Sequence, residues 1–423
     1  MATLTCDPLR RLSGKIPPID LYPLLVQHPR GKKFRCVSQF VMIIFEKNVF
    51  EGRRPLHVLI VVVGDDKDAP LFNAQAFCQS VVDFWIRHDD ETLAHGMSLG
   101  TIDLVASDSR EPNGAVTVRV PSGTHTVENP NWANARRAIQ NWCARVQKDG
   151  AGIIHWVGHG YAEGMQEGGG VQILFTDDKL ENRREGINWN TTIVGIDERT
   201  RGKPVFCFVD GCRVSQPSEG LYQSAFDGTV WPERKQAAVV YGVAPGSPGI
   251  WDDMRHFGDR AADLDFSGGP VATNAFVKCF EGLGADYVPG RGRHDVKMHR
   301  IEEGSRALVC RWMHAIGRPV ANGDDKDMVF VDYAGRFAPM IHSLTPQSAV
   351  DVMSQGATAC SLTSIATAVP AHGVMVPSSQ PSTFEFIVPR GDFNADVRDG
   401  SGSYRKPLGE TITIPHQQVT VAR

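Results

Sequence analysis

The sequence lacks any long apolar segment and has almost no excess of charge of either sign. Its apolar runs fall well short of the ~18 residues of a membrane-spanning helix, and the run at residues 40–45 is far too short. Residues 1–20 hold charged residues and three prolines instead of the apolar core of a secretory signal. Forty-four basic against 48 acidic residues give a net charge of −4, whereas a general polyanion-binding surface needs a basic excess. We therefore expect a cytoplasmic protein with no membrane and no nucleic-acid partner.

Paired metal-ligand motifs are also missing. The nine cysteines are scattered, and no Cys-x-x-Cys pair occurs, which predicts reduced thiols and neither a disulfide scaffold nor a structural zinc module. His155 and His159 are four residues apart, but on a strand this spacing separates them by ~13 Å, too far to bind one ion. The residues therefore predict no metal site and no cofactor.

Strands that read as fully buried alternate with helices in the central part of the chain. The β-branched run at residues 57–63 is typical of a strand covered on both faces. Further strands are expected at 101–106, 151–157, 171–175, 205–209 and 237–243, and helices after Asn73, after Pro130, at 271–283 and at 297–316. This alternation predicts an α/β fold with a mostly parallel six-stranded sheet and helices on both faces.

The length of 423 residues suggests two to three units at ~150 residues each. The α/β alternation ends near residue 320, and the last forty residues contain alternating runs such as residues 411–414. We therefore expect an N-terminal extension at 1–55, an α/β domain at 56–320 and a β-rich C-terminal addition at 321–423.

Two of the expected strands end in residues that carry chemistry. Gly158-His159-Gly160 follows the strand at 151–157, and Asp210-Gly211-Cys212 follows the strand at 205–209. Ligands of open α/β sheets bind at the carboxyl edge, where both segments are expected. A neighbouring imidazole shifts a thiol toward the thiolate and can later protonate a leaving amine. We therefore predict that Cys212 is a nucleophile and His159 its general acid and base.

With these motifs the sequence resembles the caspase-like cysteine proteases, the clan of caspases, metacaspases, paracaspases and bacterial CHAT-type proteases. The matching pieces span residues 57–285 and are the strand at 57–63, His159-Gly160, residues 174–178, residues 210–213, residues 239–246 and the helix after Pro270. The resemblance implies a caspase-like sandwich and a peptidase with protein substrates. It also implies that the backbone N–H groups of Gly160 and Cys212 receive the oxyanion.

The resemblance points to a bacterial member with a role in defence or programmed cell death. A calcium requirement, as in some metacaspases, stays open. The alternative is a catalytically silent adaptor of the same fold that works by binding. A buried cysteine or histidine taken alone is more often structural than catalytic.

Asp210 predicts specificity for a basic residue before the scissile bond. Side chains alternate along an extended segment, so Asp210 can point the same way as Cys212. A carboxylate in a pocket favours a cation, and a guanidinium can pair with it bidentately, so Arg is expected before Lys. The resemblance agrees, since family members with Asp here cut after basic residues. They draw a second acid from the loop after the first strand, where Asp65, Asp66 and Asp68 all stand as candidates.

A polar linker with two prolines and two glycines, residues 214–236, follows Cys212. Loop tips of this composition are preferred sites of proteolysis, and in caspases the corresponding linker is where the zymogen is cut. Arg234 and Lys235 are the candidate processing sites, cut by the protein itself or by an upstream activating protease. An ordinary surface loop is the alternative.

Overall fold

A computed structural model gives the fold of the chain. The described residues belong to one compact unit, residues 40–423. They are 42–49, 52–64, 73–87, 89, 97–108, 110–111, 114–163, 171–180, 183–211, 222–227, 238–241, 251–252, 269–283, 285–288, 293–296, 298–315, 330–333, 342–343, 346–377, 379–413 and 416–422.

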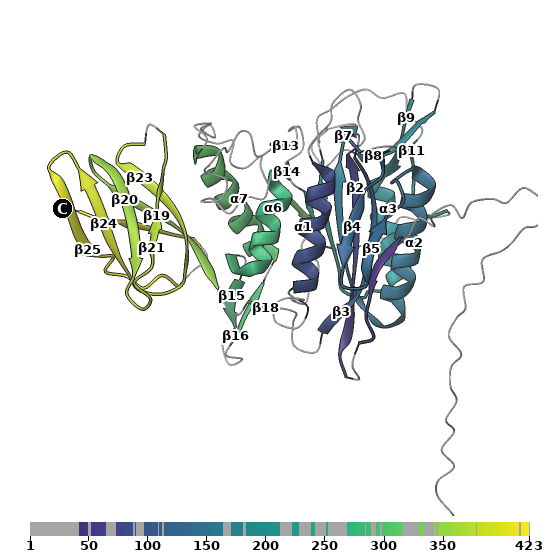
Figure 1. Cartoon of the computed structure of the whole chain (residues 1–423), viewed down its shortest axis with the longest axis horizontal. Helices are drawn as coiled ribbons and strands as arrows, with labels where there is room; N and C mark the ends of the chain where they lie inside the picture. The colour runs from purple at the N-terminus through teal and green to yellow at the C-terminus, as the bar shows by residue number, and fades with distance from the viewer. Residues whose placement is uncertain are drawn as a thin grey trace, which may run out of the picture. The chain divides into compact units, whose positions relative to one another are not determined.

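A mixed seven-stranded sheet forms the centre of the α/β part (Figure 1). Its strands, in spatial order, are β1 (Ile43–Glu46), β3 (Met97–Asp108), β2 (Arg54–Gly64), β6 (Ala151–Gly158), β10 (Val205–Asp210), β12 (Ala238–Tyr241) and β17 (Phe330–Tyr333). The five central strands are parallel, and β1 and β17 are antiparallel at the two edges. The predicted α/β fold with a mostly parallel sheet is confirmed. The sheet has seven strands in place of the expected six, and the strand expected at 171–175 belongs to a separate sheet as β8 (Val171–Leu180).

The two edge strands lie outside the range 56–320 that the sequence predicts for the α/β domain. β1 has four residues, and a strand of this length carries too few residues for a period-2 pattern to stand out. The run at residues 40–45 had no clear period for the same reason. The central sheet therefore includes one strand from each of the two flanking regions, 1–55 and 321–423.

Helices cover both faces of the sheet. α1 (Ala74–Arg87), α6 (Val271–Lys278) and α7 (Met298–Ala315) contribute to one buried core, and α2 (Trp132–Asp149) and α3 (Trp189–Thr200) contribute to the other. Along β2 the even-numbered residues from Val58 to Val62 enter the first core and the odd-numbered residues from Leu59 to Val63 enter the second. Burial on both faces explains why this strand is continuously apolar in the sequence.

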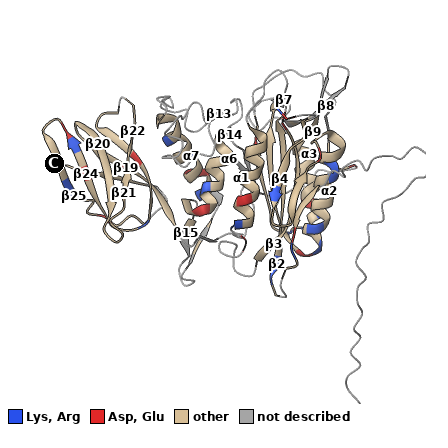
Figure 2. Ribbon diagram, in the orientation of Figure 1, with Lys and Arg blue, Asp and Glu red and all other residues tan. Residues whose placement is uncertain are grey.

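Charged residues lie mainly on the helices and not on the central strands. Figure 2 shows them on helices α1, α2 and α7, while the ribbon of the central strands is mostly without charge. In the part of the chain that the structure describes, no helix is long and apolar enough to cross a membrane.

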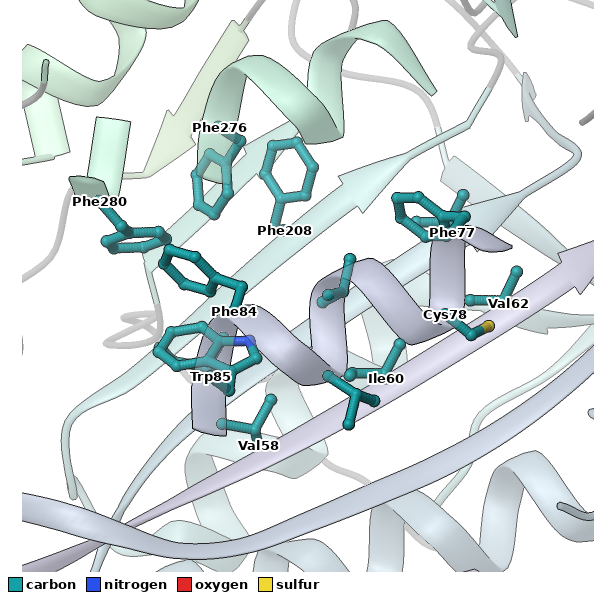
Figure 3. Packing of buried hydrophobic residues seen from close by; sticks show 14 of the residues in the cluster. Val58, Ile60, Val62, Phe77, Cys78, Phe84, Trp85, Phe208, Phe276 and Phe280 are labelled. Atoms are coloured by element: carbon teal, nitrogen blue, oxygen red, sulfur yellow. The ribbon is translucent and has the colours of Figure 1, made fainter. Parts of the chain in front are cut away.

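An aromatic cluster fixes α6 against the sheet. The rings of Phe208 on β10 and Phe276 on α6 are stacked with their centroids 3.8 Å apart, and Phe280 packs edge-on against Phe276 at 4.8 Å. Figure 3 shows these rings beside Trp85 of α1. The chain continues as a π-helical turn, Cys279–Leu283, that contains a kink at Gly282 with φ 143°. The predicted helix at 271–283 is thus confirmed except at this kink.

Smaller sheets surround the main one. A four-stranded sheet consists of β11 (Tyr222–Gln223), β9 (Arg183–Asn188), β8 (Val171–Leu180) and β7 (Gly160–Glu163). Strands β4 (Thr117–Val120) and β5 (Gly123–Thr126) form a hairpin, and β13 (Trp251–Asp252) pairs with β14 (Gly269–Pro270). A three-stranded sheet consists of β15 (Ala285–Val288), β16 (Arg293–Val296) and β18 (His342–Ser343).

The C-terminal region is β-rich, as the sequence predicts. One of its four-stranded sheets is β22 (Val374–Met375), β23 (Ser382–Pro389), β19 (Gln347–Ser354) and β26 (His416–Thr420), and the other is β21 (Pro370–His372), β20 (Ala357–Ser364), β24 (Phe393–Asp399) and β25 (Gly402–Pro407). Both sheets contribute to one apolar core that includes Val350 and Phe386 from the first and Leu362 and Val397 from the second. Helix α7 reaches this region through His314, whose Nδ1 lies 2.9 Å from an Oε2 of Glu385.

Replacing Phe276 by alanine should destabilise the protein by about 3–5 kcal/mol, because the variant loses a buried ring and leaves a cavity between α6 and β10. Urea unfolding followed by tryptophan fluorescence measures the change. The control is Val369→Ala on the C-terminal β-rich region, where the side chain is 63% exposed and the change should stay within about 0.5 kcal/mol. Equal losses in both variants would contradict the packing described here.

Candidate active site

The pairing of β6 with β10 sets the geometry of the candidate site. The two strands are parallel, and each pair of opposite residues, from Gly152 with Val205 to Val157 with Asp210, differs by 53 in residue number. His159 is two residues beyond Val157, and Cys212 is two residues beyond Asp210, so their numbers also differ by 53 (212 − 159). The segments that follow β6 and β10 therefore leave the sheet side by side at its carboxyl edge.

The backbones stay close where the strands end. A Cβ added to Gly211 would lie 2.8 Å from the carbonyl oxygen of Gly158 and 3.9 Å from the amide nitrogen of Gly160. A Cβ added to Gly158 would in turn lie 2.9 Å from Cβ of Val63. Glycine is thus required at both positions by the close approach of neighbouring strands. Gly211 lies against the segment that carries His159.

His159 occupies the junction between two sheets. It follows the last residue of β6 and precedes β7, whose first residue, Gly160, pairs with Leu174 of β8. The side chain of His159 is half-buried. This position leaves the imidazole at the carboxyl edge of the main sheet, where the sequence places it.

His155, in contrast, belongs to the core. Its ring is surrounded by Trp85, Phe208 and Phe276 at centroid distances of 5.8, 6.1 and 6.0 Å. Burial lowers the pKa of His155 to about 3, so the ring is neutral at physiological pH. Among the described residues there is also no group of three His, Cys, Asp or Glu side chains that could hold a metal ion.

Asp210 is fully buried at the end of β10 and is anchored to α6. Its Oδ2 accepts hydrogen bonds from the backbone nitrogen of Thr273 at 2.8 Å and from the Thr273 hydroxyl at 2.7 Å. Thr273 is the third residue of α6, so the carboxylate caps the amino end of this helix. Oδ1 of Asp210 accepts no hydrogen bond from any residue that the structure describes.

The environment of Asp210 favours its neutral form. Burial raises the pKa of Asp210 from about 3.8 to about 6, and the two hydrogen bonds from Thr273 oppose this shift. The sequence reasoning missed Thr273, because nothing in a linear pattern links it to an aspartate 63 residues earlier. The start of the helix at Pro270 was the one available signal.

Asp108, which the sequence reasoning did not single out, ends β3 at the same edge. Its Oδ2 accepts a hydrogen bond from the backbone nitrogen of Gln75 at 3.0 Å, so it caps α1 as Asp210 caps α6. Its Oδ1 accepts hydrogen bonds from the backbone nitrogen and Nε of Arg110, both at 3.1 Å. Both oxygens of Asp108 therefore have donors, whereas at Asp210 only Oδ2 has donors among the described residues.

The other predicted site residues lie outside the described part of the chain. They are Cys212, the second-acid candidates Asp65, Asp66 and Asp68, and the processing candidates Arg234 and Lys235. Their roles stay predictions.

No protein-family model matches the sequence, and no curated protein matches it significantly. Solved structures of insect caspases do match. Caspase-1 from Spodoptera frugiperda is 11% identical, and the match covers 70% of this chain and 91% of that one with a TM-score of 0.34. The Drosophila initiator caspase Dronc is 10% identical, and the match covers 74% and 96% of the two chains with a TM-score of 0.35. Caspases are thus among the structures to which this chain is similar.

Replacing Asp210 by asparagine should stabilise the protein at pH 8 and have little effect at pH 4. The folded-state pKa of Asp210 is raised, so the stability associated with its neutral form is complete below pH ~4 and is lost as the pH rises through 6. A shift of about two units corresponds to up to about 3 kcal/mol. Urea unfolding of both proteins at the two pH values measures the difference.

Asp396→Asn is the matched control with the opposite sign, because a hydrogen bond from Arg405 lowers the pKa of Asp396. This variant should lose stability at pH 8 relative to the wild type. If Asp210→Asn were less stable than the wild type at pH 8, the helix cap would outweigh burial and our account of Asp210 would be wrong.

Proposed function

We propose that this protein is a cysteine endopeptidase in which Cys212 is the nucleophile and His159 the general acid and base. The observation that carries the proposal is the constant offset of 53 between paired residues of β6 and β10. Consecutive Cα atoms are 3.8 Å apart, and Gly211 lies against Gly158 and Gly160. In the proposal, the thiol of Cys212, the residue after Gly211, lies beside the imidazole of His159.

The proposed reaction runs through a thioester. His159 accepts the proton of the Cys212 thiol, and the thiolate sulfur forms a bond to the scissile carbonyl carbon. The backbone N–H groups of Gly160 and Cys212 stabilise the negative charge that develops on the carbonyl oxygen. The C–N bond then breaks as the imidazolium donates its proton to the leaving amine. Water, deprotonated by His159, forms a bond to the thioester carbon, and the C–S bond breaks to release the acid. The imidazolium then returns its proton to the sulfur of Cys212.

We further propose that the peptidase cuts proteins after basic residues, Arg before Lys. A buried carboxyl two residues before the nucleophile favours a cation in the adjoining pocket and disfavours an acidic side chain. One of Asp65, Asp66 and Asp68 supplies a second acid in this proposal. Placement in a bacterial defence or cell-death pathway, and any requirement for calcium, rest on the sequence resemblance alone.

Fluorogenic peptides that differ only in the residue before the scissile bond test the proposal. The wild-type protein should cleave after Arg, less well after Lys and not after Asp. His159→Ala and Cys212→Ala should each lower kcat/KM by on the order of a thousandfold, since each removes a group that acts in the transition state.

Cys143→Ala is the matched control, because Cys143 is buried on α2 in the core and should leave kcat/KM nearly unchanged. Near-full activity of His159→Ala would reject the dyad. Persistence of the biological function in Cys212→Ala would favour the silent adaptor, and efficient cleavage after Asp would reject the pocket.

Proteolytic activation is tested in the linker of residues 214–236. Replacing both Arg234 and Lys235 by glutamine should prevent cleavage there and leave the protein in a weakly active form, whether it cuts itself or depends on an upstream protease. Intact-mass spectrometry in parallel with the peptide assay reports both quantities. Full activity of an uncut chain would show that cleavage is not required.

A further inference from the structure

We propose that Thr273 is a positioning residue for substrate specificity: it holds one oxygen of Asp210, so that the other is presented to the cationic side chain of the substrate. This inference rests on the proposed function, since it concerns the same pocket. Thr273 is fully buried on α6, so it acts through Asp210 and not through contact with the substrate.

Both donors of Thr273 are directed at a single oxygen. The backbone nitrogen and the hydroxyl lie 2.8 and 2.7 Å from Oδ2 of Asp210. A carboxylate oxygen offers about two acceptor sites, so Oδ2 is fully used. The amino end of α6 adds its partial positive charge to this interaction.

The helix that carries Thr273 is itself fixed on β10. Phe208, two residues before Asp210, stacks on Phe276, three residues after Thr273, at a centroid distance of 3.8 Å. Phe206, two residues before Phe208 on the same face of β10, stacks on the Phe276 ring at a centroid distance of 5.2 Å. The strand and the helix are thus joined by an aromatic stack and by the Asp210–Thr273 hydrogen bonds. The carboxyl plane of Asp210 cannot rotate without breaking those hydrogen bonds.

Oδ1 of Asp210 is the oxygen that remains. It is buried and accepts no hydrogen bond from the described residues, and a buried acceptor without a donor is costly. Asp108 at the same edge shows the other case, since Arg110 and Gln75 already supply donors to both of its oxygens. Of these two carboxyls, Asp210 is therefore the one that gains more from a cation brought by a substrate.

The inference also replaces the bidentate pairing that the sequence predicts by contacts to two separate acids. With Oδ2 occupied, a guanidinium meets Asp210 through one N–H group, and its second N–H group must go to another acceptor. A second acid in the loop after β2, the region of Asp65, Asp66 and Asp68, is the acceptor that the proposed function already includes. Arginine then gains over lysine by reaching two separate acids.

Removal of the Thr273 hydroxyl tests the inference. Two peptides, identical except for Arg or Met before the scissile bond, are assayed with the wild type, Thr273→Val and Thr273→Ser. Thr273→Val should lower kcat/KM for the Arg peptide about tenfold, the value of one hydrogen bond to a charged group. The Met peptide should change less than about twofold, and Thr273→Ser, which keeps the hydroxyl, should stay near the wild type on both.

The pH profile gives a readout that a merely structural role would not move. The Thr273 hydrogen bonds hold the pKa of Asp210 down against burial, so losing one raises it further. The acid limb of kcat/KM should shift to higher pH in Thr273→Val for the Arg peptide and stay in place for the Met peptide. Thr200→Val is the matched control, because the Thr200 hydroxyl is equally buried but donates to the carbonyl of Ile196 within α3. Thr200→Val should leave the acid limb of kcat/KM in place for both peptides.

The outcomes separate this inference from the proposed function. An unchanged Arg-to-Met ratio and an unshifted acid limb in Thr273→Val would overturn the role of Thr273, while turnover by the wild type and its loss in Cys212→Ala would still support the peptidase. If the wild type cleaves neither peptide, the proposed function fails and this inference fails with it. Should Thr273→Val not fold, the same ratio and limb measured for Thr273→Ala decide the question.

Discussion

The parallel pairing of β6 with β10 is the constraint on which the rest of the candidate site depends. Its register fixes the offset of 53 between opposite residues, and a slip by one residue would turn every following side chain to the other face. The register is held by two cores, since consecutive residues of β10, such as Phe208 and Val209, enter different ones. The position of His159 relative to Asp210 is therefore a product of hydrophobic packing far more than of any local interaction.

Backbone contact at the carboxyl edge adds a second constraint. Gly158 and Gly211 have no room for a side chain, because Val63 and the Gly158 carbonyl oxygen occupy that space. The two segments can thus follow each other closely beyond the end of the sheet. Next to them, Asp210 is buried with its pKa raised to about 6, a cost to stability that is typical of functional sites. The hydrogen bonds from Thr273 offset part of this cost.

The sequence predicted the parts of the fold whose signal is repeated along the chain. The strands at β2, β6 and β10 are covered on both faces, so their apolar runs are continuous and easily recognised. The helix expected after Pro130 begins at Trp132 with Asn131 as its side-chain cap, a difference within the ordinary uncertainty of helix ends. The edge strand β1 was missed because four residues show no clear period, and β17 lies in the range 321–423 that the sequence assigns to the C-terminal region.

Contacts between distant residues were the part that no local pattern could predict. The helix cap of Asp210 on Thr273 joins residues 63 apart, and the sequence alone presented Asp210 with both of its oxygens available to a substrate. The pattern did predict that His159 follows a buried strand at the carboxyl edge. This prediction was possible because the end of a strand is visible in the local sequence, whereas the hydrogen-bond partner of a carboxylate is set by tertiary contacts.

The most direct test of the dyad is the pH dependence of Cys212 alkylation by iodoacetamide, followed on its own peptide by mass spectrometry. The buried thiols of Cys279 and Cys360 have pKa values raised to about 12, so they react slowly. If the register brings His159 to Cys212, the wild-type thiol should react well below pH 8, and His159→Ala should react only as the pH approaches the ordinary thiol value of about 8.5. Identical pH profiles for the two proteins would contradict the account.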